Sequence, residues 1–439
     1  MTRENLKGAS TLKEAAKAAY LPGIDFTGTY FYNQRIINLL GEDAKLPTMS
    51  FDPSTMSYQY NLVKGPDGKP VVNPETGGYI PSEVAVIPKE AMSYDIHNVF
   101  AGAFTLTQPV YMGGQIRAMN QIAGFGEKIA AAMSNNVAQE IVYTVDEAYW
   151  TVISLKEKKR LAESFVSLTD SLCNNVRIML EEGVATKSDL LSVEVRVNEA
   201  NIALLKVSNG LVLSRMALAQ ICGLPPNTQM ELSDESLPQS AYYDTNPATP
   251  NLQEVYSRRQ DLEMVRQSIN LLKSRENLSL SELLPKIAVV GAYSFSNPNV
   301  IDGFKKRFGG GFSVGAMLQV PIWHWGGDYK RYKAAKSNTT AQRLLLEDLE
   351  EKVQLQVNQA QFSLDEADKT YKMASLNLRK ADENLRQAQL GFKEGVLTTS
   401  DVLAAQTAWL GANSEKIDAE IGLRLANTYL SKVLGNLPY

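Results

Sequence analysis

The chain has few of the residues that build chemical sites. Its 439 residues include two cysteines, Cys173 and Cys222, and two histidines, His97 and His324. The cysteines lie too far apart in the sequence for a metal-binding pair, and two histidines are too few to favour a zinc site or a histidine-based triad. No constellation of titratable residues recurs or clusters. We therefore expect no catalytic residue, no metal and no cofactor.

The sequence also lacks a strong charge of either sign and a long apolar run. Its net charge is −4, from 44 basic and 48 acidic residues, whereas a nucleic-acid-binding protein needs a basic surface. No run of about 18 apolar residues predicts a membrane-spanning helix. The first residues are typical of a polar helix rather than of a signal peptide. Taken alone, these absences favour a cytosolic protein, an interpretation that the repeats contradict.

What the chain does have is an internal repeat. The segment 182–191, Glu-Gly-Val-Ala-Thr-Lys-Ser-Asp-Leu-Leu, recurs 212 positions later, at 394–403, as Glu-Gly-Val-Leu-Thr-Thr-Ser-Asp-Val-Leu. Leu-Pro-Gly-Ile at 21–24 matches Leu-Pro-Lys-Ile at 284–287 with an offset of 263, so the first half carries 51 extra residues (263 − 212). The sequence therefore predicts one structural unit used twice. The two predicted repeats cover residues 1–239 and 240–439.

Each repeat contains two segments with the alternation of a β-strand. Apolar side chains such as Ile24, Phe26 and Tyr30 occupy every second position, and small or polar side chains lie between them. This period over about ten residues suits a strand of a membrane barrel. A half-buried sheet of a soluble protein would show the same pattern. The expected strands cover about 23–33 and 98–108 in the first repeat, and about 286–296 and 311–322 in the second.

After each strand pair the sequence predicts a very long helical hairpin. The outgoing leg has nearly 70 residues and spans roughly 100 Å at 1.5 Å per residue. From Ala360 to Phe392, apolar residues step by four and three, and small ones alternate with large ones. This pattern is typical of a coiled coil whose helix axes lie close together. The expected hairpins cover 115–222 and 328–434, and a further helix is expected over 250–283.

This plan resembles the TolC-like outer-membrane efflux family (outer membrane factors) across nearly the whole chain. The duplicated strand–strand–hairpin unit, the paired Gly-x-x-Thr-x-x-Asp turns and the Leu-Pro start of the first strand carry the resemblance together. The resemblance implies an α+β membrane protein. Four strands per chain would close a trimeric, twelve-stranded β-barrel, continuous with a periplasmic α-helical coiled-coil barrel. Closing the barrel would also pair the backbone N–H and C=O groups at the strand edges, which lipid cannot hydrogen-bond.

The resemblance also implies a function and its partners. The chain would be the passive exit duct of a tripartite efflux or type I secretion system, in the cell outer membrane with its helical tunnel in the periplasm. The implied partners are two further copies of the chain, a periplasmic adaptor (membrane fusion) protein, an inner-membrane pump of RND or ABC type and outer-membrane lipid, without nucleic acid. The alternative is a soluble coiled-coil scaffold, which would not explain the alternating strands. The family's signal peptide would lie upstream of Met1, so we expect a processed or truncated chain.

The two turns at the ends of the hairpins are the candidate functional residues. Glycine ends the first helix, and a threonine followed three residues later by an aspartate caps the next. The resemblance implies that these turns contact the adaptor through Gly183, Val184, Thr186, Asp189, Gly395, Val396, Thr398 and Asp401. It also implies an entrance constriction formed by Asp189, Phe392 and Asp401. Leu397 and Ala404 depart from the family's polar pattern there, and a plain helix cap explains both aspartates equally well.

Two further features accompany the strands. Aromatic residues follow the second strand of each repeat, and we expect Tyr111, Trp323 and Trp325 at a membrane interface. The extra residues fall within about 34–97, where Gly-Pro-Asp-Gly between apolar runs predicts a hairpin. Because this segment joins two barrel strands at the ends away from the helices, we expect it outside the cell.

Overall fold

The computed structural model describes residues 1–236 and 250–438. The chain divides into a helical unit, made of Met1–Ala16, Arg117–Ser279 and Tyr329–Tyr439, and a strand unit, made of Lys17–Ile116 and Leu280–Asp328. The expected boundary between the two repeats, at 239–240, lies outside the described residues.

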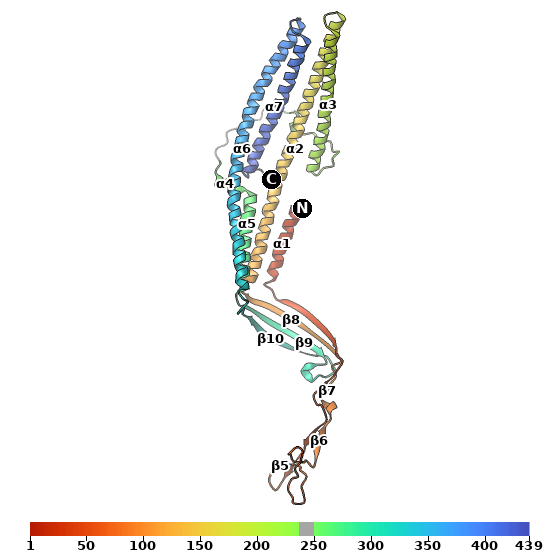
Figure 1. The fold of residues 1–439 in the computed structure, drawn as a ribbon, viewed down its shortest axis with the longest axis vertical. Helices are drawn as coiled ribbons and strands as arrows, with labels where there is room; N and C mark the ends of the chain where they lie inside the picture. The colour runs from red at the N-terminus through yellow and green to blue at the C-terminus, as the bar shows by residue number, and fades with distance from the viewer. Residues whose placement is uncertain (237–249, 439) are drawn as a thin grey trace. The chain divides into compact units, whose positions relative to one another are not determined.

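The strand unit is built on a four-stranded antiparallel sheet with the order β1–β8–β9–β10 (Figure 1). β10 ends two residues before Pro321, which has no N–H to donate to the ladder. It is therefore shorter at this end than the expected 311–322. β8 runs beyond the expected residue 108 because the pairing shifts between Pro109 and Tyr111, and this irregularity accommodates the proline. The strands are β1 (Gly23–Tyr32), β8 (Asn98–Met112), β9 (Lys286–Asn297) and β10 (Gly309–Gln319).

One face of this sheet is aromatic. The register places Phe26, Phe104, Tyr293 and Phe312 side by side in one row across the four strands. The rings of Phe26 and Phe104 lie 4.8 Å apart between centroids. All four side chains are nonetheless about half exposed or more, at 58%, 50%, 47% and 74%. An apolar face of this extent is unusual on a surface that meets water and is typical of one that meets lipid.

The opposite face of the sheet carries small side chains. In the neighbouring row the register aligns Thr27, Ala103, Ser294 and Gly311. We call this surface the small-residue face. The alternation of aromatic or aliphatic residues with small or polar ones along the strands therefore gives the sheet two chemically different sides, as a barrel with a lipid-facing exterior and a polar interior requires.

The segment between β1 and β8 forms three two-stranded ribbons without a core. No described residue between 33 and 97 is buried. The backbone N–H of Asn33 donates to the carbonyl of His97, and the Asn33 side chain donates to the carbonyl of Ile96, which closes the base of the segment. The ribbons pair β2 (Ile37–Asn38) with β7 (Ser93–Tyr94), β3 (Ala44–Pro47) with β6 (Val84–Ile87), and β4 (Met49–Asp52) with β5 (Ser57–Tyr60).

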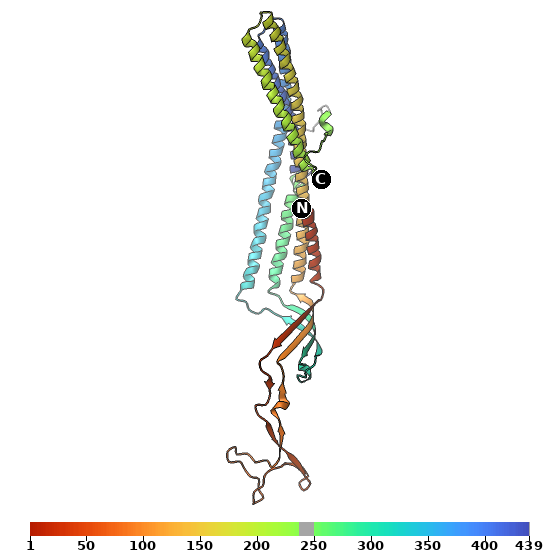
Figure 2. The ribbon, with the colours of Figure 1, turned by 90° about the vertical axis from the view of Figure 1, so that its right-hand side faces the viewer.

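Two helical hairpins make up most of the helical unit (Figures 1 and 2). The first joins α2 (Gln115–Glu181) to α3 (Lys187–Ile221), and the second joins α6 (Gly327–Lys393) to α7 (Thr399–Val433). Each outgoing helix has 67 residues and each return helix has 35. The shorter helices of this unit are α1 (Thr2–Ala18), α4 (Leu252–Arg258) and α5 (Gln260–Ser281).

The two hairpins contact each other along α2 and α7, and near the tips α3 also lies against α7. Leu168 of α2 packs against a cluster that includes Ala405 and Trp409 of α7. Lys158 Nζ lies 2.6 Å from a carboxylate oxygen of Asp418. α2 and α7 thus form the seam that joins the two hairpins of one chain.

α3 has a large apolar surface that the chain itself does not cover. Of the helices in the described part of the chain, it alone is long and apolar enough to cross a membrane, by length and composition only, with a mean hydropathy of 1.4 over 18 residues. The sequence predicted no membrane-spanning helix because it has no unbroken apolar run of about 18 residues. α3 meets the criterion through its mean hydropathy, although polar residues interrupt its apolar runs. Only 17% of that window is buried, and Leu205, Val212 and Leu213 are more than half exposed. This surface needs a partner.

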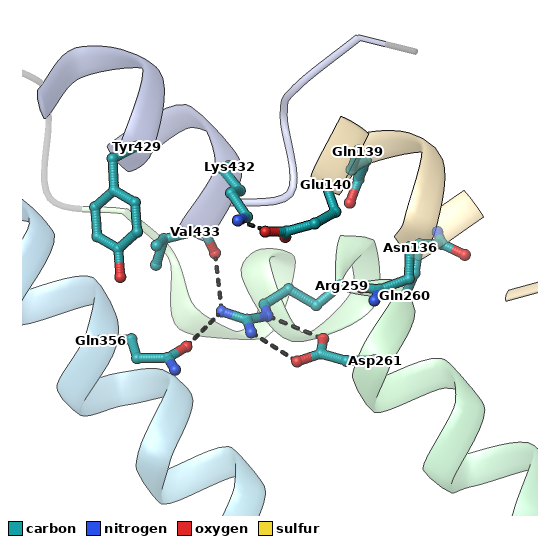
Figure 3. A pocket seen from close by; sticks show the side chains of 10 residues that line it. All are labelled: Asn136, Gln139, Glu140, Arg259, Gln260, Asp261, Gln356, Tyr429, Lys432 and Val433. Atoms are coloured by element: carbon teal, nitrogen blue, oxygen red, sulfur yellow. Dashed lines mark hydrogen bonds and ion pairs between the residues drawn. The ribbon is translucent and has the colours of Figure 1, made fainter. Parts of the chain in front are cut away.

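The structure corrects one expected helix. The sequence predicts a single helix over 250–283, but Arg259 has extended backbone angles (φ −72°, ψ 119°) and separates α4 from α5. Its guanidinium donates to the Asp261 carboxylate at 2.6 Å, to Gln356 Oε1 at 3.0 Å and to the carbonyl of Val433 at 3.4 Å (Figure 3). These contacts with α6 and α7 stabilise the break. Burial alone would raise the pKa of Asp261, but hydrogen bonding to Arg259 and its charge lower it below its ordinary value.

Candidate functional site

The turn of each hairpin reverses through a glycine. Gly183 and Gly395 have φ angles of 79° and 73°, the left-handed conformation that ends many helices. The next residue donates back into the helix: the N–H of Val184 to the carbonyl of Met179, and that of Val396 to the carbonyl of Gly391, each at 2.8 Å. Both turns are therefore built by the same Schellman-type hydrogen bonds.

The return helix of each hairpin starts with a capping box. Thr186 Oγ1 accepts from the N–H of Asp189, while the Asp189 carboxylate accepts from the N–H of Thr186 at 2.9 Å. Thr398 and Asp401 make the same pair of bonds. Hydrogen bonds from the threonine side chain and backbone lower the pKa of each aspartate below its ordinary value. Both carboxylates are thus ionised near neutral pH and hold their turns in shape.

A groove of about 650 Å³ lies between the two tips of the chain. α2 lines one wall and the end of α6 with the start of α7 lines the other. About half of the lining residues are apolar, and the polar ones are Ser171, Asn175, Gln389 and Gln406, with Lys393 and Glu394 beside the second turn. We call it the tip groove. Its mixed lining and open form suit a protein segment better than a reacting small molecule.

A buried aromatic side chain that lines this groove also joins the two tips. Phe392 at the end of α6 is 9% exposed and lies in a cluster with Leu172 and Val176 of α2, Val193 of α3 and Val402 of α7. This cluster therefore joins residues of all four long helices. The spacing of the two tips depends on this cluster.

The structure brings some of the predicted tip residues together and not others. Val184, Phe392 and Gly395 all line the tip groove. Asp189 and Asp401 instead contact the threonines of their own turns, Thr186 and Thr398. Val396 is 78% exposed at its turn.

Sequence reasoning missed Gln406, which the structure places in the wall of the tip groove. Its side chain is 1% exposed, and its Oε1 has no hydrogen-bond partner among the described residues. A buried acceptor without a partner carries a free-energy cost, so an incoming donor would relieve it. Gln406 follows Ala405 and lies off the predicted α7 seam, so no local pattern signals its burial.

The predicted interfacial aromatics lie in the strand unit and are exposed. Tyr111 is the last residue but one of β8 and is 46% exposed, while Trp323 and Trp325 follow β10 and are 70% and 87% exposed. The two indole rings lie edge to face with 6.1 Å between centroids. Among the described residues, no group of three or more His, Cys, Asp and Glu side chains could hold a metal ion.

Comparisons with known proteins agree with this architecture. A family model described as outer membrane efflux protein matches residues 87–224 and 251–436. The curated outer membrane efflux protein BepC of Brucella suis biovar 1 (strain 1330) is 23% identical over 345 residues, covering 76% of this chain and 71% of BepC.

Solved structures share the fold. The open state of the MtrE outer membrane channel of Neisseria gonorrhoeae superposes with a TM-score of 0.74 at 16% identity, covering 99% of this chain and 85% of MtrE. The CmeC outer membrane channel of Campylobacter jejuni gives a TM-score of 0.70 at 13% identity, covering 99% of this chain and 82% of CmeC. The predicted TolC-like fold and outer membrane efflux function are confirmed. The chain belongs to the outer membrane efflux protein family.

Proposed function

We propose that three copies of this chain form the exit duct of a tripartite efflux or type I secretion system. The sheet is the observation that carries this proposal. Its outer strands, β1 and β10, have no partner strand along their outer edges in the described chain, and its aromatic face is exposed. Unpaired strand edges are too costly to leave in lipid. Pairing β1 of one copy with β10 of the next would close a twelve-stranded barrel around the small-residue face.

The helices support the same assembly. Apolar side chains stay exposed on α3, including Leu205 and Leu213, and on α6, including Leu355 and Phe362, which is 75% exposed. α2 and α7 already contact each other within the chain. In a closed ring, α3 of one copy would therefore meet α6 of the next, and these surfaces would cover each other.

The partner at the tips is proposed to be a periplasmic adaptor protein, which would link the duct to an inner-membrane pump of RND or ABC type. The tip groove offers apolar side chains together with the Gln406 acceptor, which has no hydrogen-bond partner among the residues described. These features suit a helical hairpin end that carries a hydrogen-bond donor. Both turns, residues 183–189 and 395–401, would contact the adaptor. The proposed entrance constriction places Asp189 and Asp401 at the opening, with Phe392 setting the spacing of the tips behind them.

The membrane position follows from the aromatic residues. Tyr111, Trp323 and Trp325 would lie at a membrane interface, because an indole or phenol ring is most stable where apolar and polar surroundings meet. The helices would then occupy the periplasm and the ribbons between β1 and β8 would lie outside the cell. We also propose that residues 1–239 and 240–439 are the two structural repeats.

Mass measurement in detergent tests the assembly. We expect a protein mass of three times the 48.4 kDa chain, because four strands cannot close a pore and twelve can. Subtracting the bound detergent by light scattering or native mass spectrometry gives the protein mass. A monodisperse monomer that stays soluble without detergent would contradict the proposal and favour a soluble coiled-coil scaffold.

Removing the ribbon segment should leave assembly intact. We expect a chain with residues 34–94 replaced by a short Gly/Ser bridge to form trimers at near-normal abundance, because no residue of the segment is buried and its ends are already joined at Asn33 and His97. Immunoblots of unheated outer-membrane fractions measure the trimer. If trimers disappear, the segment is structural.

A further inference from the structure

The loop between β9 and β10 lies over the small-residue face of the sheet. A hollow of about 300 Å³ is lined on one side by Thr27, Ala103 and Ser294 and on the other by Val300 and Ile301 of this loop. A Cβ placed on Gly311, whose register partner is Ser294, would lie 3.0 Å from Ile301 Cδ1. The aliphatic end of the loop therefore turns onto this face.

Hydrogen bonds fix the loop in this position. Ser296 is 8% exposed, and its hydroxyl donates to the carbonyl of Pro298 at 2.9 Å and accepts from the N–H of Val300 at 3.3 Å. The Asn299 side chain accepts from the N–H of Ile301 at 3.1 Å. At the base of the loop, the Asn299 N–H donates to the carbonyl of Lys305 at 2.9 Å. These hydrogen bonds hold the backbone of Val300 and Ile301 in one position.

The small-residue face is the interior of the proposed barrel. The opposite face carries the aromatic row and would meet lipid, so the hollow under Ile301 opens toward the pore. Val300 and Ile301 are 56% and 66% exposed, although polar or charged side chains are the usual lining of a water-filled barrel. The charged residues of the loop are paired elsewhere: Asp302 with Lys305 and Arg307, and Lys306 with Asp95.

We infer that Val300 and Ile301 of three copies form an apolar constriction inside the barrel, at the strand ends that carry the ribbon segment. The inference rests on the proposed trimer. A ring of aliphatic side chains disfavours water and hydrated ions while it accepts apolar surface. The constriction therefore selects for apolar or amphiphilic solutes over small hydrated ions, and Ile301 is its main determinant.

Cysteine labelling in planar bilayers tests this inference. The channel carries Ile301→Cys in a Cys173→Ala, Cys222→Ala background, and a cationic methanethiosulfonate reagent is added while current is recorded. We expect the current to fall by about half or more as charged groups enter the narrow ring. Phe308→Cys is the matched control: Phe308 is 61% exposed in the same loop region, but its ring lies near Phe100 and Phe295 of the aromatic face. Its labelling should leave the current unchanged.

A second variant keeps the test independent of labelling. Val300→Ser with Ile301→Ser should raise single-channel conductance about twofold or more, because polar side chains hydrate the ring. A labelled Ile301→Cys trimer that conducts unchanged, with label confirmed by mass, overturns the constriction alone, and so does unchanged conductance of the serine variant. If the unmodified parent chain is a monomer in detergent, the proposed trimer fails and the constriction fails with it.

Discussion

Replacing Gly395 by tryptophan is expected to abolish transport while trimer abundance stays near normal. Gly395 adopts a φ of 73°, which a side chain strains by roughly 1–2 kcal/mol. Beyond its chain neighbours, a Cβ at this position would meet no atom of the described residues within 4 Å, so a side chain here starts into open space. This strain is too small to unfold helices of 67 and 35 residues that pack along their length. The indole would, however, stand at the tip groove that Gly395 lines and exclude a docked partner.

Gly395→Asn is the matched control for this substitution. Asparagine tolerates the left-handed conformation and is much smaller than tryptophan, so we expect it to retain most transport. Trimer immunoblots and dye efflux in one strain would measure both variants. Normal efflux by Gly395→Trp would show that the tips do not form the adaptor contact, and equal loss in both variants would attribute the effect to backbone strain.

An arginine in the aromatic row is expected to remove most of the assembled protein. Phe104 lies near the middle of β8 and beside Phe26 and Tyr293 on the exposed aromatic face. A charged side chain on the lipid face of a barrel costs about 2–4 kcal/mol at the bilayer midplane. In a trimer Phe104→Arg introduces this cost in every copy. We therefore expect little trimer in the outer-membrane fraction, as measured by immunoblotting of unheated samples.

Thr105→Arg separates the lipid face from the strand itself. Thr105 is the next residue of β8 and faces the opposite side of the sheet, aligned with Asp25 and Ala292. In a closed barrel its side chain would project into the aqueous interior, where arginine is tolerated. We expect normal trimer abundance with a change in ion selectivity. If Thr105→Arg and Phe104→Arg were equally harmful, the assignment of the two faces would be wrong.

The strands and long helices could be predicted because their patterns are local. Alternation in β1 and the four-and-three steps from Ala360 to Phe392 depend only on neighbouring positions in the sequence, and a duplicated chain displays each pattern twice. The threonine helix caps at 186 and 398 were predicted for the same reason, and the structure shows that each is a full capping box. Family resemblance then supplied the barrel and the outer membrane.

The features that sequence reasoning missed depend on residues far apart in the chain. The break at Arg259 is stabilised by Gln356 of α6 and the carbonyl of Val433 in α7. No local pattern reports such contacts, and Arg259 stands in an otherwise regular helical sequence. Gln406 was missed because its burial results from packing between hairpins. The position of Ile301 over the small-residue face likewise depends on how the loop folds back.

The outer edges of β1 and β10, which have no partner strand in the described part of the chain, have a genetic consequence. If each copy must supply one edge to each neighbour, a single defective edge leaves a whole ring open, whatever the quality of the other two chains. A variant with a damaged β10 edge, produced beside the normal chain, would enter most assemblies and disable them. Such alleles should be dominant over the normal gene, whereas alleles that prevent folding of the chain before assembly should be recessive.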